Sequence, residues 1–109
     1  MKIFNLKNFI GGWFIGDFSP TIVSTEKFEI SVKNYKKGDR ESSHTHLLAE
    51  ELTVIAEGSV TMNGNIYKKG DIILIEKGEY TDFNAIEDSI TVVVKIPSVK
   101  GDKYVADKS

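Results

Sequence analysis

The sequence contains no cysteine among its 109 residues. This absence excludes disulfide bonds, thiolate catalysis and cysteine-ligated zinc or iron–sulfur sites. Long hydrophobic runs are also lacking, because stretches such as Ile72–Ile75 are four residues or shorter, whereas a membrane-spanning helix needs about 20 apolar residues. The N-terminus interrupts its apolar residues with polar ones, so it lacks the continuous apolar stretch of a secretory signal. We therefore predict a cytoplasmic protein with no membrane partner.

Excess charge of one sign is missing as well. Lys and Arg number 14 and Asp and Glu number 16, which gives a net charge of −2, and the basic residues are spread along the chain. A surface that binds nucleic acid needs a basic patch, so no nucleic-acid partner is expected. The length suits a single domain over residues 1–109, and a hydrophobic content of 40% is enough to bury one core.

Helical periodicity is nearly absent, and short strand-like runs take its place. Residues 27–33 alternate strictly, with Phe28, Ile30 and Val32 on one face. Asn63-Gly64 separates two further runs and predicts a tight hairpin, because a type I′ turn needs positive φ at both central positions. The remaining predicted strands cover residues 52–56, 59–62, 65–67, 71–75 and 89–96. Pro97 is expected to end the last strand, because proline cannot extend a ladder.

These runs predict an all-β fold, either a small antiparallel β-barrel or a double-sheet jelly roll. An immunoglobulin-like sandwich is the alternative, and the absent Cys–Trp–Cys pattern disfavours it. Residues 1–25 are predicted to form N-terminal strands, with the aromatic segment 9–18 serving as core, dimer surface or pocket wall. We expect a homodimer that uses this segment. Residues 100–109 are predicted to be a polar tail, with residues 107–109 disordered.

The residues that carry chemistry are His44, His46 and Glu51. The two histidines are the only ones in the chain, and residues two apart on a strand point to the same face. If the chain turns at residues 47–50, Glu51 returns beside them. Two imidazoles and one carboxylate form a ligand set that leaves coordination positions open and suits Fe(II) among other divalent metals.

The spacing around this cluster resembles the first motif of the cupin superfamily, G(X)5HXH(X)3,4E(X)6G. Gly38, His44, His46, Glu51 and Gly58 match every fixed position. The second motif, G(X)5PXG(X)2H(X)3N, is matched only in part. Its two glycines are Gly70 and Gly78, whereas Glu76, Thr81 and Ala85 stand where Pro, His and Asn are usual.

The resemblance implies a small single-domain cupin with its site in the mouth of the barrel. It assigns His44, His46 and Glu51 as ligands of a divalent ion, which would be Fe, Mn, Ni or Zn. The fourth ligand is replaced by Thr81, and strict alternation turns the neighbouring Asp82 away from the site. The other residues expected to line the pocket are Tyr35, Thr53, Tyr67, Thr81 and Phe83, and residues 39–41 are expected to form a solvated turn.

Three functions are compatible with this pattern. The first is a metal-dependent enzyme, of oxygenase or isomerase type, that acts on a small polar molecule. The second is a metal-free isomerase or epimerase acting on a sugar or nucleotide-sugar, with His44 or His46 as the catalytic base. The third is a non-catalytic ligand-binding or regulatory domain, because one fold serves many roles.

Overall fold

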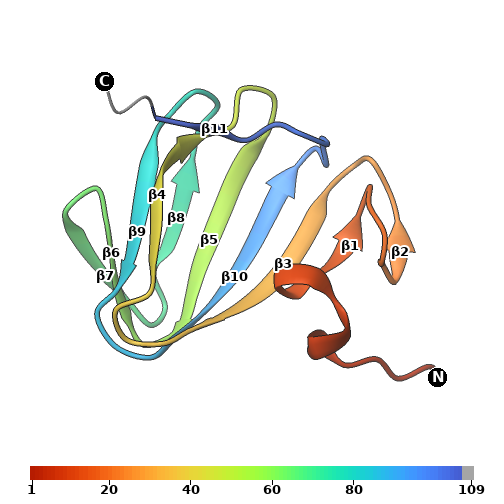
Figure 1. Cartoon of the computed structure of the whole chain (residues 1–109), viewed down its shortest axis with the longest axis horizontal. Coiled ribbons are helices and arrows are strands. Elements are labelled where there is room, and N and C mark those ends of the chain that lie inside the picture. Colours follow the sequence, from red (N-terminus) through yellow and green to blue (C-terminus); the bar gives the residue numbers. More distant parts are fainter. Residues whose placement is uncertain (107–109) are drawn as a thin grey trace.

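The structure is a computed structural model that describes residues 1–106 (Figure 1). The predicted disorder of residues 107–109 therefore lies outside the described residues. Within them the chain is nearly all β. The elements in order are η1 (Leu6–Asn8), η2 (Ile10–Gly12), β1 (Trp13–Gly16), β2 (Val23–Ser24), β3 (Glu29–Tyr35), β4 (Arg40–Thr45), β5 (Glu50–Glu57), β6 (Ser59–Met62), β7 (Asn65–Lys68), β8 (Ile72–Ile75), β9 (Thr81–Ala85), β10 (Ser89–Ile96) and β11 (Tyr104–Val105).

The strands form two sheets, which confirms the predicted jelly-roll architecture. One sheet has the order β2-β1-β3-β10-β5-β8, and the other has the order β11-β4-β9-β6-β7. Adjacent strands pair antiparallel except β1 and β2, which are parallel. The apolar core lies between the sheets and takes residues from both of them. Its buried members are Ile55, Val60, Met62, Ile75, Phe83 and Ala85.

The predicted hairpin is present between β6 and β7. Met62 pairs with Asn65 across the two-residue turn, and Asn63 and Gly64 have φ values of 51° and 80°. Both angles are positive, as a type I′ turn requires. The predicted strand 89–96 matches β10 residue for residue, but β10 is not the last strand, because β11 follows it.

The alternation predicted for residues 27–33 is present in β3, although Phe28 lies just before the strand. Ser31 faces the barrel interior and is fully buried, whereas Phe28 is exposed. The interior face of β3 is therefore its polar face. The neighbouring strands have the same character, because their interior side chains are apolar at one end of the barrel and polar at the other end, where Glu51 and Thr53 lie.

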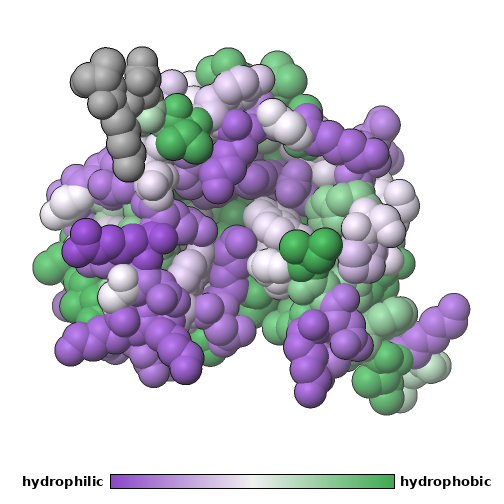
Figure 2. All heavy atoms as spheres, viewed as in Figure 1, coloured by the Kyte–Doolittle hydropathy of each residue, from purple (hydrophilic) through white to green (hydrophobic). Residues whose placement is uncertain are grey.

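The outer face of the six-stranded sheet is apolar. Cross-strand pairing places Ile72 beside Val54, Val54 beside Val92 and Val92 beside Val32. Ile72 on the edge strand is 65% exposed. By contrast, polar and charged residues gather on the opposite side of the molecule, over β4 and β9 (Figure 2). The homodimer predicted from the sequence stays a prediction.

Two predictions about the chain ends need correction. Residues 1–25 were expected to form strands, but Leu6–Asn8 and Ile10–Gly12 form 3-10 turns, and the strands of this segment are Trp13–Gly16 and Val23–Ser24. The C-terminal segment is not a simple tail, because Tyr104 and Val105 pair with β4 and Asp102 is only 6% exposed. This segment crosses the mouth of the barrel (Figure 1). No helix within residues 1–106 is long and apolar enough to cross a membrane.

Candidate functional site

The two histidines stand at the end of β4 and are held in the same tautomer. Nδ1–H of His44 donates to the main-chain oxygen of Ser42 at 3.0 Å. Nδ1–H of His46 donates to the main-chain oxygen of Asp102 at 2.6 Å. A neutral imidazole with its proton on Nδ1 has its lone pair on Nε2. Each ring therefore offers Nε2 as an acceptor to whatever lies in front of it.

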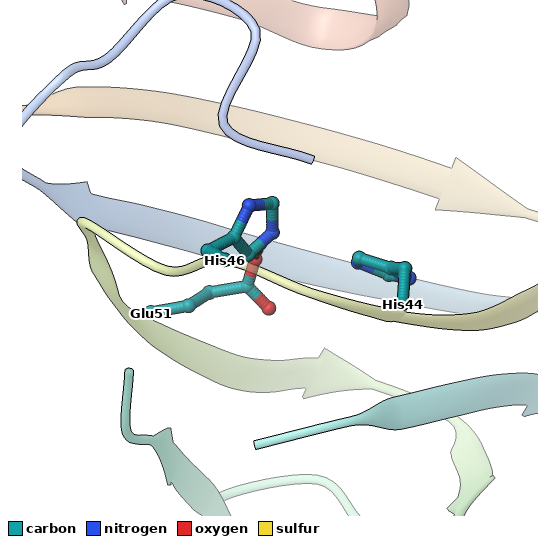
Figure 3. A group of neighbouring side chains, drawn as sticks. All are labelled: His44, His46 and Glu51. Carbon is teal, nitrogen blue, oxygen red and sulfur yellow. Dashed lines mark ion pairs between the residues drawn. The ribbon is translucent and has the colours of Figure 1, made fainter. Parts of the chain in front are cut away.

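Glu51, at the start of β5, points its carboxylate toward these rings (Figure 3). Its Oε1 lies 3.5 Å from Nε2 of His46, and its Oε2 accepts a hydrogen bond from the Thr53 hydroxyl at 3.2 Å. Burial acts to raise the pKa of the Glu51 carboxyl, but a hydrogen bond from His46, which requires a proton on Nε2 as well, and the charge of Lys95 hold the pKa below its ordinary value. The carboxylate is therefore ionised at neutral pH.

The predicted cluster is thus assembled in three dimensions. One nitrogen from each histidine and one oxygen from Glu51 all lie within 4.8 Å of one another. His46 is 5% exposed, and its Nε2 has no hydrogen-bond partner among the described residues. A buried polar atom without a partner costs about 1–3 kcal/mol, so this nitrogen faces a position that another group is expected to fill.

The loop that joins His46 to Glu51 is fixed by the buried carboxylate of Asp102. Its Oδ1 accepts hydrogen bonds from the main-chain N–H groups of Leu47 and Leu48, at 3.1 and 3.2 Å. Its Oδ2 accepts from Leu48 and Ala49, both at 3.0 Å. One side chain therefore holds the turn that returns Glu51 to the histidines, while its own main-chain oxygen orients the His46 ring.

A cavity of about 140 Å³ opens beside the cluster, lined by His44 and Glu51. Four of the predicted pocket residues also line it: Tyr35, Thr53, Thr81 and Phe83. The structure does not place the fifth, Tyr67, in this cavity, because its side chain packs against the apolar core instead. Register explains the difference, since Tyr67 lies opposite the fully buried Val60, at the apolar end of the barrel.

Glu41 was expected to lie in a solvated turn, but it belongs to β4 and also lines the cavity. Its Oε1 accepts a hydrogen bond from the Tyr35 hydroxyl at 3.2 Å. Burial, together with the negative charge of Glu41, raises the pKa of Tyr35. The Tyr35 hydroxyl therefore keeps its proton and remains a hydrogen-bond donor throughout the neutral range.

Comparison with known proteins identifies the fold. No model of a known protein family matches the sequence, and no curated protein matches it. Solved structures do match. A protein with a double-stranded β-helix domain from Klebsiella pneumoniae superposes with a TM-score of 0.73 at 21% identity, over 98% of this chain and 93% of that one. A sugar phosphate isomerase of the cupin superfamily from Silicibacter pomeroyi gives 0.64 at 17% identity, over 74% and 57%.

The chain has the cupin fold. A third structure supports the same assignment, the DMSP lyase DddQ from Ruegeria pomeroyi, with a TM-score of 0.71 at 16% identity. The match covers 86% of this chain and 49% of that one. These identities are low, so the three structures establish the architecture only.

The cupin motif glycines have structural roles. Gly58 has a φ of +87°, and a Cβ atom there would lie 2.2 Å from Oγ of Ser89, so no larger residue fits. Gly78, in the second motif, has a φ of +82° and donates its N–H to the main-chain oxygen of His46 at 2.8 Å. The partial second motif therefore still contacts the histidine strand.

The replacement of the usual cupin histidine by Thr81 lies within the site. Thr81 is the register partner of His44 and lines the cavity, so it occupies the place expected for the missing ligand. Asp82 does not substitute for it. Its Oδ1 accepts a hydrogen bond from the N–H of Asn63 at 2.7 Å, which directs the carboxylate to the β6–β7 turn.

Several residues of the site were missed by the sequence analysis. The cavity is also lined by Trp13, Lys33, Lys95 and Lys103. A signal for Lys95 was present, because it shares the parity of Val93 and Thr91 in β10, both of which are buried. Trp13 lies in the aromatic segment for which a pocket wall was one of the stated alternatives. Asp102 had no local signal, because its contacts are made with residues more than fifty positions away.

Proposed function

We propose that His44, His46 and Glu51 bind a divalent metal ion and that the adjacent cavity is the active site of an enzyme acting on a small polar molecule. The observation that carries this proposal is the contact between Nε2 of His46 and Oε1 of Glu51, at 3.5 Å. With its proton on Nδ1, His46 presents a lone pair to a carboxylate. Two acceptors at this distance require a cation between them, either a proton or a metal ion.

The donor set fits a metal better than a proton alone. Two imidazole nitrogens and one carboxylate oxygen converge within 4.8 Å, and both histidines have their second nitrogen fixed by a main-chain carbonyl. Ligating histidines characteristically donate their other N–H to such an acceptor, which fixes the tautomer. Two histidines and one carboxylate leave open positions and suit Fe(II), and Mn(II), Ni(II) and Zn(II) are the other candidates.

A bound divalent ion would supply Lewis-acid or redox chemistry at the open positions. The chain contributes the surroundings. Tyr35 keeps its proton and donates it to Glu41, which fixes both side chains in the cavity wall, and Phe83 packs its ring against Tyr35 with the ring centres 4.4 Å apart. Two of the structures with this fold are a DMSP lyase and a sugar phosphate isomerase, which favours small-molecule chemistry.

A metal-free isomerase is the second candidate, and Thr81 is the observation that favours it. A hydroxyl stands where the fourth imidazole is expected. In a metal-free isomerase, the Nε2 lone pair of His44 or His46 would serve as the catalytic base. The two candidates differ in whether Glu51 has to bind a metal.

Calorimetric titration with Fe(II) under anaerobic conditions, Mn(II), Ni(II) and Zn(II) distinguishes them. Glu51→Gln removes the charged ligand and keeps its size, and Glu50→Gln is a matched control because Glu50 is exposed. We expect one site in the wild type and in Glu50→Gln, with affinity lower by about tenfold or more in Glu51→Gln. Equal affinity in all three proteins, or no binding in the wild type, would overturn the proposal.

A further inference from the structure

The cavity has a cationic side that the metal cluster does not explain. Lys33 in β3 and Lys95 in β10 line it together with His44 and Glu51, and the exposed Lys103 lies at its rim. Lys33 and Lys95 both approach Trp13, with their Nζ atoms 5.1 and 5.0 Å from the centre of the ring. Two ammonium groups are thus gathered on one aromatic ring, beside the candidate metal site.

These lysines lack carboxylate partners. Among residues 1–106, none of the three has a carboxylate oxygen within 4.0 Å. Lys33 makes one hydrogen bond, to the main-chain oxygen of Gly11 at 3.3 Å, although an ammonium carries three protons. Burial lowers the pKa of Lys33, and although the charge of Glu41 acts to raise it, Lys95 and Lys103 act with burial. The protein therefore holds like charges together with no carboxylate in direct contact with them among the described residues.

The carboxylates that line the same cavity contact groups other than these lysines. Glu51 faces His46 and accepts from Thr53. Glu41 accepts from Tyr35, and Asp82 accepts from the main chain of Asn63. Because the carboxylate of Asp82 is directed to the β6–β7 turn, two carboxylates, those of Glu41 and Glu51, remain beside the three lysines of the cavity lining. The lining therefore has one positive charge in excess by itself, and it would have three with a divalent ion on the histidines.

The size of the cavity limits what can neutralise this charge. A cavity of about 150 Å³ accommodates benzene, and this one measures about 140 Å³. A ligand of about six to eight heavy atoms is therefore the right size, and a whole nucleotide-sugar is too large. A short organic acid with its negative charge at one end satisfies both limits.

We propose that the substrate is a small organic acid, with its carboxylate held between Lys33 and Lys95 on Trp13 and its other end directed toward His44 and Glu51. This inference rests on the proposed function in treating the cavity as the substrate site. It assigns Lys33 and Lys95 as the residues that select an anionic substrate. The ammonium groups attract the carboxylate, and the Trp13 ring provides the apolar wall against its carbon chain.

The fluorescence of Trp13 gives a direct test, because it is the only tryptophan in the chain. Metal-free protein is titrated with butyrate, at constant ionic strength, and in parallel with the neutral butyramide. We expect a saturable change with butyrate only. Lys33→Met and Lys95→Met should each weaken binding by about tenfold or more. Lys69→Met is the control that should bind like the wild type, because Lys69 pairs with Glu57 on the surface.

The outcomes separate this inference from the metal proposal. Butyrate binding that persists in the Glu51→Gln variant supports the cationic site whether or not a metal is bound. Equal responses to butyrate and butyramide would overturn the inference, as would wild-type binding in both lysine variants. Metal binding without butyrate binding would leave the metal proposal in place and overturn the assignment of an organic acid as the substrate.

Discussion

The main-chain oxygen of Asp102 accepts a hydrogen bond from Nδ1–H of His46 at 2.6 Å, across 56 residues of sequence. The carboxylate of the same residue accepts hydrogen bonds from three consecutive N–H groups in the loop between His46 and Glu51. Asp102 therefore acts on both ends of the ligand set without touching the metal position. The C-terminal segment is a part of the site for this reason.

Asp102→Ala tests this role. The substitution leaves the N–H groups of residues 47–49 without their acceptor, and hydrogen bonds to charged groups are worth about 1.5–3 kcal/mol each. We expect the free energy of unfolding in urea to fall by about 3 kcal/mol and the metal affinity to fall by about tenfold. Asp71→Ala is a matched control, because Asp71 is exposed and caps one N–H, that of Lys68. An Asp102→Ala protein with wild-type metal affinity would contradict the positioning role.

Thr81→His tests whether the barrel presents position 81 to the metal. Thr81 lies opposite His44 and lines the cavity, so an imidazole there should complete the ligand set. We expect metal affinity to rise by about tenfold, equivalent to about 1.4 kcal/mol, in a calorimetric titration. Asp82→His should bring no such gain, because the side chain at position 82 is directed to the Asn63 turn. Unchanged affinity in Thr81→His would show that position 81 does not reach the ion.

Gly58→Ala tests the close approach at the end of β5. The new Cβ would lie 2.5 Å from the main-chain oxygen of Asp88, in a backbone with a φ of +87°. A left-handed conformation costs about 1–2 kcal/mol, and overpacking adds about 1–3 kcal/mol. We expect a total loss of about 3 kcal/mol in urea unfolding. Gly64→Ala, where φ is +80° and nothing lies within 4 Å, should lose only the cost of the left-handed conformation. Equal losses in the two variants would contradict the packing argument.

Tyr35 gives a prediction for alkaline pH. Its pKa is raised in the folded protein by burial and by Glu41, so above about pH 10 the unfolded chain releases a proton that the folded protein keeps. Stability is unaffected below that pH and falls above it, by about 1.4 kcal/mol per pH unit for one group. Tyr35→Phe should remove this contribution, and Tyr80→Phe should retain it, because Tyr80 is 49% exposed. The measurement is urea unfolding from about pH 9 to pH 11, and parallel slopes in all three proteins would contradict it.

The strands and the ligand set were accessible from the sequence because both have local signals. Period-2 alternation and the Asn63-Gly64 turn depend on residues that are close along the chain. The spacing of His44, His46 and Glu51 around a four-residue turn also brings the ligands together locally. These features needed no knowledge of which strands would pair.

The surroundings of the site were less accessible because they depend on tertiary pairing. Lys33 and Lys95 reach one cavity only because β3 and β10 are neighbours in the sheet. The alternation in residues 27–33 gave the two faces of β3 correctly, but it could not tell which face lies inside, since the interior of this barrel is polar at the mouth and the outer face of the sheet is apolar. Tyr67 has a residue type suited to a pocket, but it lies at the apolar end of the barrel, away from the cavity.

Metal binding by the cluster is tested most directly by the metal content of protein purified without chelators or affinity metals, measured by elemental analysis beside a His44→Ala, His46→Ala double variant. We predict close to one divalent ion per chain in the wild type, as purified or after reconstitution, and its loss in the variant. A wild type that holds no ion after exposure to Fe(II), Mn(II), Ni(II) and Zn(II), or a double variant that keeps a full complement, would contradict it.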